Sequence, residues 1–217
     1  MKRISIVLVT MVLISFAANG LALAGDTDHK TSKDKQAKIG EATPLFTLAD
    51  YDGKEYSLQD FQGKYVVLEW TNMDCPFVKK HYKSGNMQKL QKKYAQEGVV
   101  WLRVCSSAPG QQGHFEAKMI ANRIKTDKAM AAAYLIDEKG TVGRIYAAKT
   151  TPHMFVIDPK GVLIYAGGID DKPSTNTADI DGATNYVSQC LDAAMNGEPV
   201  KTKTSTPYGC AVKYAKK

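Results

Sequence analysis

The sequence predicts an α/β fold in which helices flank a central mixed β-sheet. Apolar runs of strand length alternate with stretches of helical periodicity, and such alternation implies crossover connections between parallel strands. Two later apolar runs, 154–158 and 162–165, are separated only by Pro159-Lys160-Gly161, which predicts a hairpin and therefore antiparallel strands in the same sheet. Apolar residues make up 44% of the chain and charged residues 24%, a composition typical of globular proteins.

The remaining elements follow from local patterns. Short alternating runs on both sides of Asp52-Gly53 predict an N-terminal β-hairpin extension. Unbroken apolar runs of strand length predict buried strands at 65–71, 99–105 and 134–136. Helical spacing, bounded by Gly, Pro and Asn, predicts helices at 76–96 (with an interruption at 84–86), 114–133, 141–148 and 185–196.

The first 24 residues have the pattern of a secretory signal peptide. A basic start precedes an apolar run, and Ala22-Leu23-Ala24 is a small-x-small cleavage pattern. The apolar run is shorter than the roughly 20 residues that a membrane helix needs. We therefore expect cleavage after Ala24 and a periplasmic or secreted mature protein without stable membrane insertion.

The composition divides the chain into four parts. The first is the signal peptide, residues 1–24. A polar segment without periodicity, 25–38, is expected to be a flexible lead-in. The periodic part, 39–196, forms one domain, and 197–217 is a C-terminal tail that carries Cys210.

The formal net charge of +7 comes largely from lysines near the two ends, which are expected to be solvated. Nucleic acid is not an expected partner of an exported protein. The sequence has no CxxC pair and no Cys/His cluster at zinc spacing, so neither a metal site nor a cofactor is expected.

Cys75 is the strongest candidate for chemistry. It lies between a buried strand and Pro76, and a proline is favoured at the first position of a helix. Cys75 is therefore expected at the helix N-cap, where backbone N–H groups and the helix dipole favour the thiolate. We expect it to be the most reactive of the four thiols. Cys105 and Cys190 fall inside a strand and a helix and are expected to be buried core residues.

Glu69 is the second candidate, because a carboxylate inside an apolar strand is costly when ionised. Its pKa is expected to rise. It precedes Cys75 on the strand that leads to it, so it could pass protons to and from the sulfur.

Thr151-Pro152 stands directly before a strand, where a proline is tolerated, and a cis bond at this position would make a sharp bend that exposes backbone groups. Cys210 follows a glycine near the C-terminus and is a possible redox partner of Cys75. A structural bridge from Cys210 to Cys105 or Cys190 is the alternative, and four cysteines allow three complete pairings.

Several motifs together resemble the thioredoxin superfamily, and within it the alkyl hydroperoxide reductase/thiol-specific antioxidant (redoxin) branch. They are IGEATPLFTL at 39–48, GKYVVL at 63–68, the cysteine at the strand-to-helix turn, and Thr151-Pro152 before FVIDPKG at 155–161. DCPFVKKHY at 74–82 and GCAVKY at 209–214 are similar to a peroxiredoxin-like subgroup with a single active-site cysteine. The resemblance implies a thioredoxin-like fold, with Glu69 as the buried acid and Pro152 as the cis-proline.

The sequence also departs from these families. Val78 stands where thioredoxins have the second cysteine of CxxC, and Asn72 stands where peroxiredoxins have Thr or Ser. The peroxiredoxin arginine has no counterpart after Arg144.

Three functional hypotheses follow. The first is an exported thiol–disulfide oxidoreductase in which Cys75 exchanges with protein thiols or disulfides, and Cys210 or an external thiol reductant completes the reaction. The second is a thiol-dependent peroxidase with antioxidant activity, in which peroxide oxidises Cys75. The missing arginine argues against it, because the transition state needs a fixed donor. The third is a non-catalytic thioredoxin-fold binding module, which the absence of CxxC keeps open.

Overall fold

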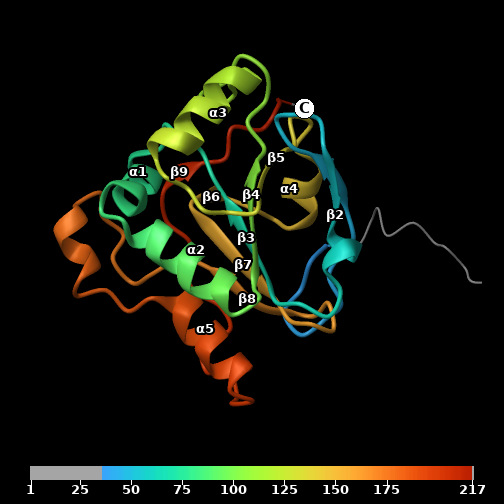
Figure 1. Ribbon diagram of the computed structural model, residues 1–217, viewed down its shortest axis with the longest axis vertical. Helices are drawn as coiled ribbons and strands as arrows, with labels where there is room; N and C mark the ends of the chain where they lie inside the picture. Colours follow the sequence, from blue (N-terminus) through green and yellow to red (C-terminus); the bar gives the residue numbers. More distant parts are fainter. Residues whose placement is uncertain (1–35, 217) are drawn as a thin grey trace, which may run out of the picture. The chain divides into compact units, whose positions relative to one another are not determined.

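The computed structural model describes residues 36–216, so the expected signal peptide and most of the expected lead-in lie outside the described residues. Within them, a central sheet has the strand order β5-β4-β3-β7-β8 (Figure 1). Its strands are β3 (Val66–Trp70), β4 (Val100–Cys105), β5 (Ala133–Ile136), β7 (His153–Ile157) and β8 (Leu163–Gly167). The first three pair in parallel, whereas β7 and β8 pair antiparallel. The predicted mixed sheet is confirmed.

Helices cover both faces of this sheet. They are α1 (Pro76–Lys83), α2 (Asn86–Gln96), α3 (Ala117–Thr126), α4 (Thr141–Ile145) and α5 (Tyr186–Met195), with short 3-10 helices η1 (Leu58–Phe61) and η2 (Thr177–Ile180). Apolar residues of α1, α2 and α5 pack on one face against Val67 and Val156. Residues of α4 and η1 pack on the opposite face against Leu68 and Phe155. Neighbouring residues of a strand thus point to opposite layers, as the two-residue repeat of a strand requires.

The N-terminal hairpin extension is also confirmed. It consists of β1 (Thr47–Ala49) and β2 (Glu55–Ser57), which pair antiparallel around Gly53. Gly53 has a φ of +84°, a backbone conformation that glycine adopts without a steric penalty.

The helix expected at 76–96 is interrupted at 84–86, as predicted from the sequence. Gly85, with a φ of +74°, precedes α2 and separates it from α1. The helix expected at 114–133 is wrong in extent, since α3 ends at Thr126. Lys128 has a φ of +50°, which breaks the helix, and the next residues lead into β5. The small apolar residues of that segment mimicked helical periodicity.

The C-terminal tail contains a contact that the sequence did not indicate. Two-residue strands β6 (Thr150–Thr151) and β9 (Cys210–Ala211) pair antiparallel, with Thr151 opposite Cys210. Tyr214 donates a hydrogen bond to the Ala148 carbonyl at 2.8 Å. The tail therefore packs against the domain at the end of the sheet that carries the loop before β7 (Figure 1). Across residues 36–216, no helix is both long enough and apolar enough to cross a bilayer.

The burial of individual side chains predicts how much each contributes to the stability of the fold. Leu68 is fully buried in the central strand β3, so Leu68→Ala should lower the free energy of unfolding by about 2–5 kcal/mol through lost burial and a residual cavity. Leu45 is 55% exposed, and Leu45→Ala should change it by no more than about 0.5 kcal/mol. Urea unfolding followed by tryptophan fluorescence measures both. Equal effects would contradict this assignment of the core.

Candidate active site

The turn after β3 places Cys75 at the start of α1. The Asn72 side-chain oxygen accepts the Asp74 N–H at 2.8 Å, and the Asn72 carbonyl accepts the Cys75 N–H at 3.0 Å. These bonds form an Asx-type turn. Cys75 is the N-cap residue of α1, with Pro76 at the first helical position. The sulfur therefore lies beside the free N–H groups of a helix start.

Thr151 lies directly against this sulfur. The Cys75 thiol donates a hydrogen bond to the Thr151 carbonyl at 2.9 Å. The Thr151–Pro152 peptide bond is cis, and both residues are buried. Two of the residues selected from sequence, Thr151 and Pro152, thus lie at the same place as Cys75 although they are far apart in the chain.

Cys210 completes a sulfur pair. It lies opposite Thr151 in the β6–β9 ladder, and its thiol and backbone hydrogen-bond to the Cys75 sulfur. Cys105 instead donates to the Gly113 carbonyl at 3.4 Å, and Cys190 is buried in α5. The structure therefore places the Cys210 thiol at the Cys75 sulfur. All four are free thiols.

The two paired thiols have opposite pKa shifts. Burial raises the pKa of Cys75, but hydrogen bonds from Thr151, Cys210 and the Val78 backbone outweigh it and hold the pKa below its ordinary value. Burial and the neighbouring Cys75 sulfur raise the pKa of Cys210 to about 11. Burial alone raises the pKa of Cys190 to about 12. Cys75 therefore ionises more readily than Cys210.

The pair is covered by the tail. Cys75 has no exposed surface, while Cys210 is partly exposed. A Cβ atom at Gly209 would clash with the Thr151 carbonyl oxygen, so only glycine allows this close approach of the tail.

Glu69 is fully buried on the sheet face that also carries α1 and α2. Tyr82 donates to its carboxylate at 3.1 Å and Trp101 donates at 2.9 Å. Arg103 Nε lies 3.7 Å from Glu69 Oε1. Burial raises the pKa of Glu69, and the Arg103 charge and the hydrogen bonds offset this only in part. The expected direction of the shift is confirmed.

Arg103 was not selected from the sequence. It lies directly opposite Glu69 in the parallel β3–β4 register, and its guanidinium is stacked between the Tyr82 and Tyr134 rings at 4.5 and 5.1 Å. A signal existed in the sequence: each of two neighbouring apolar strands carries one charged residue, of opposite sign.

Asp74 precedes the active sulfur, but its negative charge is paired. Arg123 donates to Asp74 at 2.8 Å, and Lys79 donates at 3.5 Å. Burial acts to raise the pKa of Asp74, but these cations outweigh it and lower the pKa. The paired carboxylate therefore opposes Cys75 ionisation less than a free one would. No group of three or more His, Cys, Asp or Glu able to hold a metal occurs among residues 36–216.

A cysteine at the start of a helix, a buried acid and a cis-proline loop on a sheet of this topology define a thiol-based oxidoreductase of the thioredoxin-like fold. Residues 39–166 match the model of the AhpC/TSA family. The chain belongs to that family.

Similar proteins carry related descriptions. The thiol:disulfide interchange protein DsbE of Pasteurella multocida is 30% identical over 174 residues, which cover 77% of this chain and 86% of that protein. The thioredoxin-like protein YneN of Bacillus subtilis is 29% identical, covering 70% and 87%. The thiol-disulfide oxidoreductase ResA of Bacillus cereus is 26% identical, covering 61% and 71%.

Solved structures agree on the fold. An uncharacterised conserved protein from Geobacillus kaustophilus superposes with a TM-score of 0.73 at 25% identity, covering 83% of this chain and 94% of that one. A hypothetical protein from Sinorhizobium meliloti gives a TM-score of 0.69 at 22% identity, covering 84% and 98%. The resemblance to a subgroup with a single active-site cysteine stays a prediction, and in this chain Cys210 lies beside Cys75.

Glu69 should make stability depend on pH. Because its folded-state pKa lies above the ordinary value of 4.5, the native carboxyl keeps a proton that the unfolded chain releases, and stability falls as pH rises between those two values. Glu69→Gln should reduce the loss of stability that urea unfolding shows as the pH rises above 4.5. Glu97→Gln, at an exposed position, is the control. An equal effect of both variants would contradict the raised pKa of Glu69.

The close approach at Gly209 predicts control of access to Cys75. Gly209→Ala should displace β9 from Thr151, so that iodoacetamide labels reduced Cys75 faster, by about tenfold or more, because local opening then costs less free energy. A methyl group at Gly182 would meet no atom within 4 Å, and Gly182→Ala should leave the rate unchanged. Peptide mass spectrometry measures the labelling. An unchanged rate in Gly209→Ala would show that the tail does not cover the sulfur in solution.

Proposed function

We propose that this protein is an exported thiol–disulfide oxidoreductase in which Cys75 and Cys210 form the redox pair. The observation that carries the proposal is the direct hydrogen bonding between the two sulfurs, which belong to different elements and have pKa shifts of opposite sign. Cys210 thus takes the role that a second cysteine of CxxC would have, while Val78 occupies that position of the helix.

In the proposed reaction, the Cys75 thiolate attacks a substrate disulfide and releases one substrate thiolate. A mixed disulfide between Cys75 and the substrate results. The Cys210 thiol loses its proton and attacks the Cys75 sulfur, which releases the second substrate thiolate and leaves the Cys75–Cys210 disulfide. Two electrons pass to the substrate, and an external thiol reductant restores the dithiol. Thiol oxidation of a client runs the same steps in reverse.

The other site residues act on protons and position. The Thr151 hydroxyl donates to the Cys75 thiolate, and the Thr151 carbonyl accepts from the thiol. Glu69 is proposed to exchange protons with the site, since its raised pKa brings it closer to neutral pH. Pro152 has no N–H, so it donates no backbone hydrogen bond at this position.

The sequence of the first 24 residues supports export, and protein thiols or disulfides in the periplasm or outside the cell are the proposed substrates. The relatives from Pasteurella multocida and Bacillus cereus, a thiol:disulfide interchange protein and a thiol-disulfide oxidoreductase, support the same reaction class. An oxidising compartment also permits a disulfide to persist between turnovers.

Disulfide mapping tests the proposal. The reduced mature chain is exposed to oxidised glutathione or to hydrogen peroxide, quenched with acid and digested for mass spectrometry. We expect a Cys75–Cys210 disulfide with oxidised glutathione. Cys210→Ser should instead accumulate glutathione on Cys75, with release slowed by about 10²-fold or more because the second attack is no longer intramolecular.

Cys190→Ser is the matched control and should behave as wild type, because Cys190 is buried in α5. Rapid peroxide consumption through Cys75 with little exchange on disulfides would support the peroxidase hypothesis instead. Reaction with neither oxidant would support the non-catalytic binding module. A bridge from Cys210 to Cys105 or Cys190 would contradict the assigned pair.

A further inference from the structure

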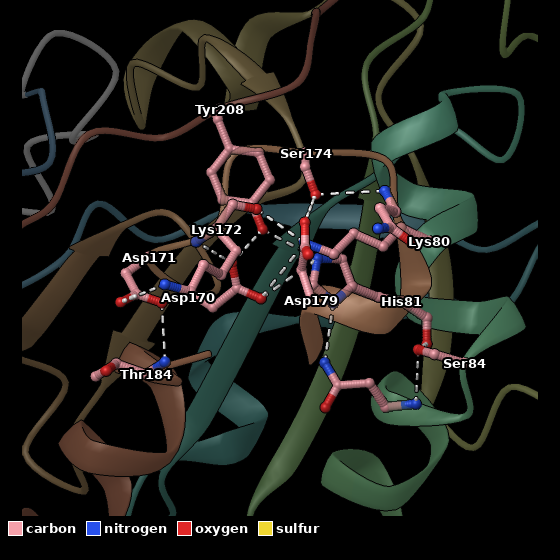
Figure 2. A network of polar contacts seen from close by, with 12 residues as sticks. Lys80, His81, Ser84, Asp170, Asp171, Lys172, Ser174, Asp179, Thr184 and Tyr208 are labelled. Carbon is pink, nitrogen blue, oxygen red and sulfur yellow. Dashed lines mark hydrogen bonds and ion pairs between the residues drawn. The ribbon is translucent and has the colours of Figure 1, made fainter. Parts of the chain in front are cut away.

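A second group of ionisable side chains is buried outside the sulfur site. Lys80, His81 and Asp170 expose 1%, 0% and 2% of their surfaces. Burying ionic groups costs several kcal/mol unless they are paired. They converge on Tyr208 of the tail (Figure 2). We refer to these four residues as the Tyr208 network.

The contacts of the network have a defined direction. Asn86 donates its amide N–H to His81 Nδ1 at 2.9 Å, so the neutral imidazole carries its proton on Nε2. Nε2 lies 3.1 Å from the Tyr208 hydroxyl and donates to it. Tyr208 in turn donates to Asp170 Oδ1 at 2.5 Å. Burial lowers the pKa of His81 to about 4, which agrees with a neutral ring.

Charge and packing complete the network. Lys80 Nζ lies 4.0 Å from Asp170 Oδ2 and 5.8 Å from the centre of the Tyr208 ring. The ring of Phe77 contacts the Tyr208 ring edge to face, with centres 5.9 Å apart. The Tyr208 side chain is therefore fixed at its hydroxyl and along its ring.

Helix α1 connects this network to the redox pair. It has Cys75 at its N-cap, and Phe77, Lys80 and His81 on the following turns contact Tyr208. Tyr208 precedes Cys210 by two residues, with Gly209 pressed against the Thr151 carbonyl between them. One helix thus holds both the first sulfur and the segment that carries the second.

We propose that Tyr208 is a positioning residue, which the Lys80–His81–Asp170 group fixes so that the Cys210 sulfur stays against Cys75. This inference rests on the proposed Cys75–Cys210 pair. Its consequence is a high effective concentration of one thiol at the other, which favours the disulfide. The first attack, by Cys75 on an outside disulfide, does not require Cys210, so Tyr208 should act on the second step and on the redox equilibrium.

A glutathione redox titration of the mature chain tests this inference. Wild type, Tyr208→Phe and Tyr214→Phe are equilibrated at a series of glutathione ratios, and the fraction of Cys75–Cys210 disulfide is measured by mass spectrometry after alkylation. Tyr208→Phe removes a hydrogen bond to a charged group and should shift the equilibrium toward the dithiol by about tenfold or more. Tyr214→Phe removes a tail hydroxyl that bonds to the Ala148 carbonyl and should shift it by less than about twofold.

Phe77→Leu is a second variant, at a half-buried position where folding tolerates change, and should shift the equilibrium in the same direction by about threefold. Circular dichroism confirms that each variant is folded. The inference is overturned if folded Tyr208→Phe and Phe77→Leu titrate like wild type, or if Tyr214→Phe shifts as far as Tyr208→Phe. Absence of a Cys75–Cys210 disulfide in wild type at every ratio would instead identify a failure of the proposed pair itself.

Discussion

The backbone of Thr151 is the point on which the site depends. Its carbonyl accepts the Cys75 thiol, its hydroxyl favours the thiolate, and its strand pairs with the segment that carries Cys210. A single residue therefore contacts both cysteines, because it presents its carbonyl to the Cys75 sulfur while it also pairs with the backbone of Cys210. The ladder position opposite Thr151 is filled by the chain's own tail, so an outside peptide must displace that tail to pair there.

Two buried acid–base pairs lie near the site, one in the sheet beneath α1 and α2 and the other between α1 and the segment after β8. Glu69 and Arg103 lie in the sheet beneath the helices. Burial raises the pKa of the Glu69 carboxyl, and the Arg103 charge partly offsets this. Lys80 and Asp170 lie beside the tail, and Asp170 accepts a hydrogen bond from Tyr208 of that tail. Pairs of this kind add little net stability compared with apolar packing, because their desolvation is costly.

The sequence predicted most of the fold because the buried strands and the turn residues carry strong local signals. Cys75 and Glu69 were recognisable for the same reason, since each is a polar or reactive residue in an apolar context. The sequence indicated the contact between Cys210 and Cys75 only as one of several possible pairings, because the contact depends on a two-residue strand with no periodicity. The Lys80–Asp170 pair was also missed: each residue looks like an ordinary surface charge until the tail covers it. The end of α3 was misjudged because alanines favour a helix wherever no tertiary contact decides otherwise.

The two sulfurs are separated by 135 positions (210 − 75) in the chain, and this has a consequence for folding. A disulfide within CxxC closes a loop of about four residues and removes only about 2 kcal/mol of chain entropy from the unfolded state, whereas a Cys75–Cys210 bridge would remove about 5 kcal/mol. By thermodynamic linkage, the oxidised form would resist unfolding far more than the reduced form. Reduction would then lower the free energy of unfolding of the whole domain as well as restore its two thiols. Resistance to heat or to proteolysis would therefore report how much of the protein is oxidised.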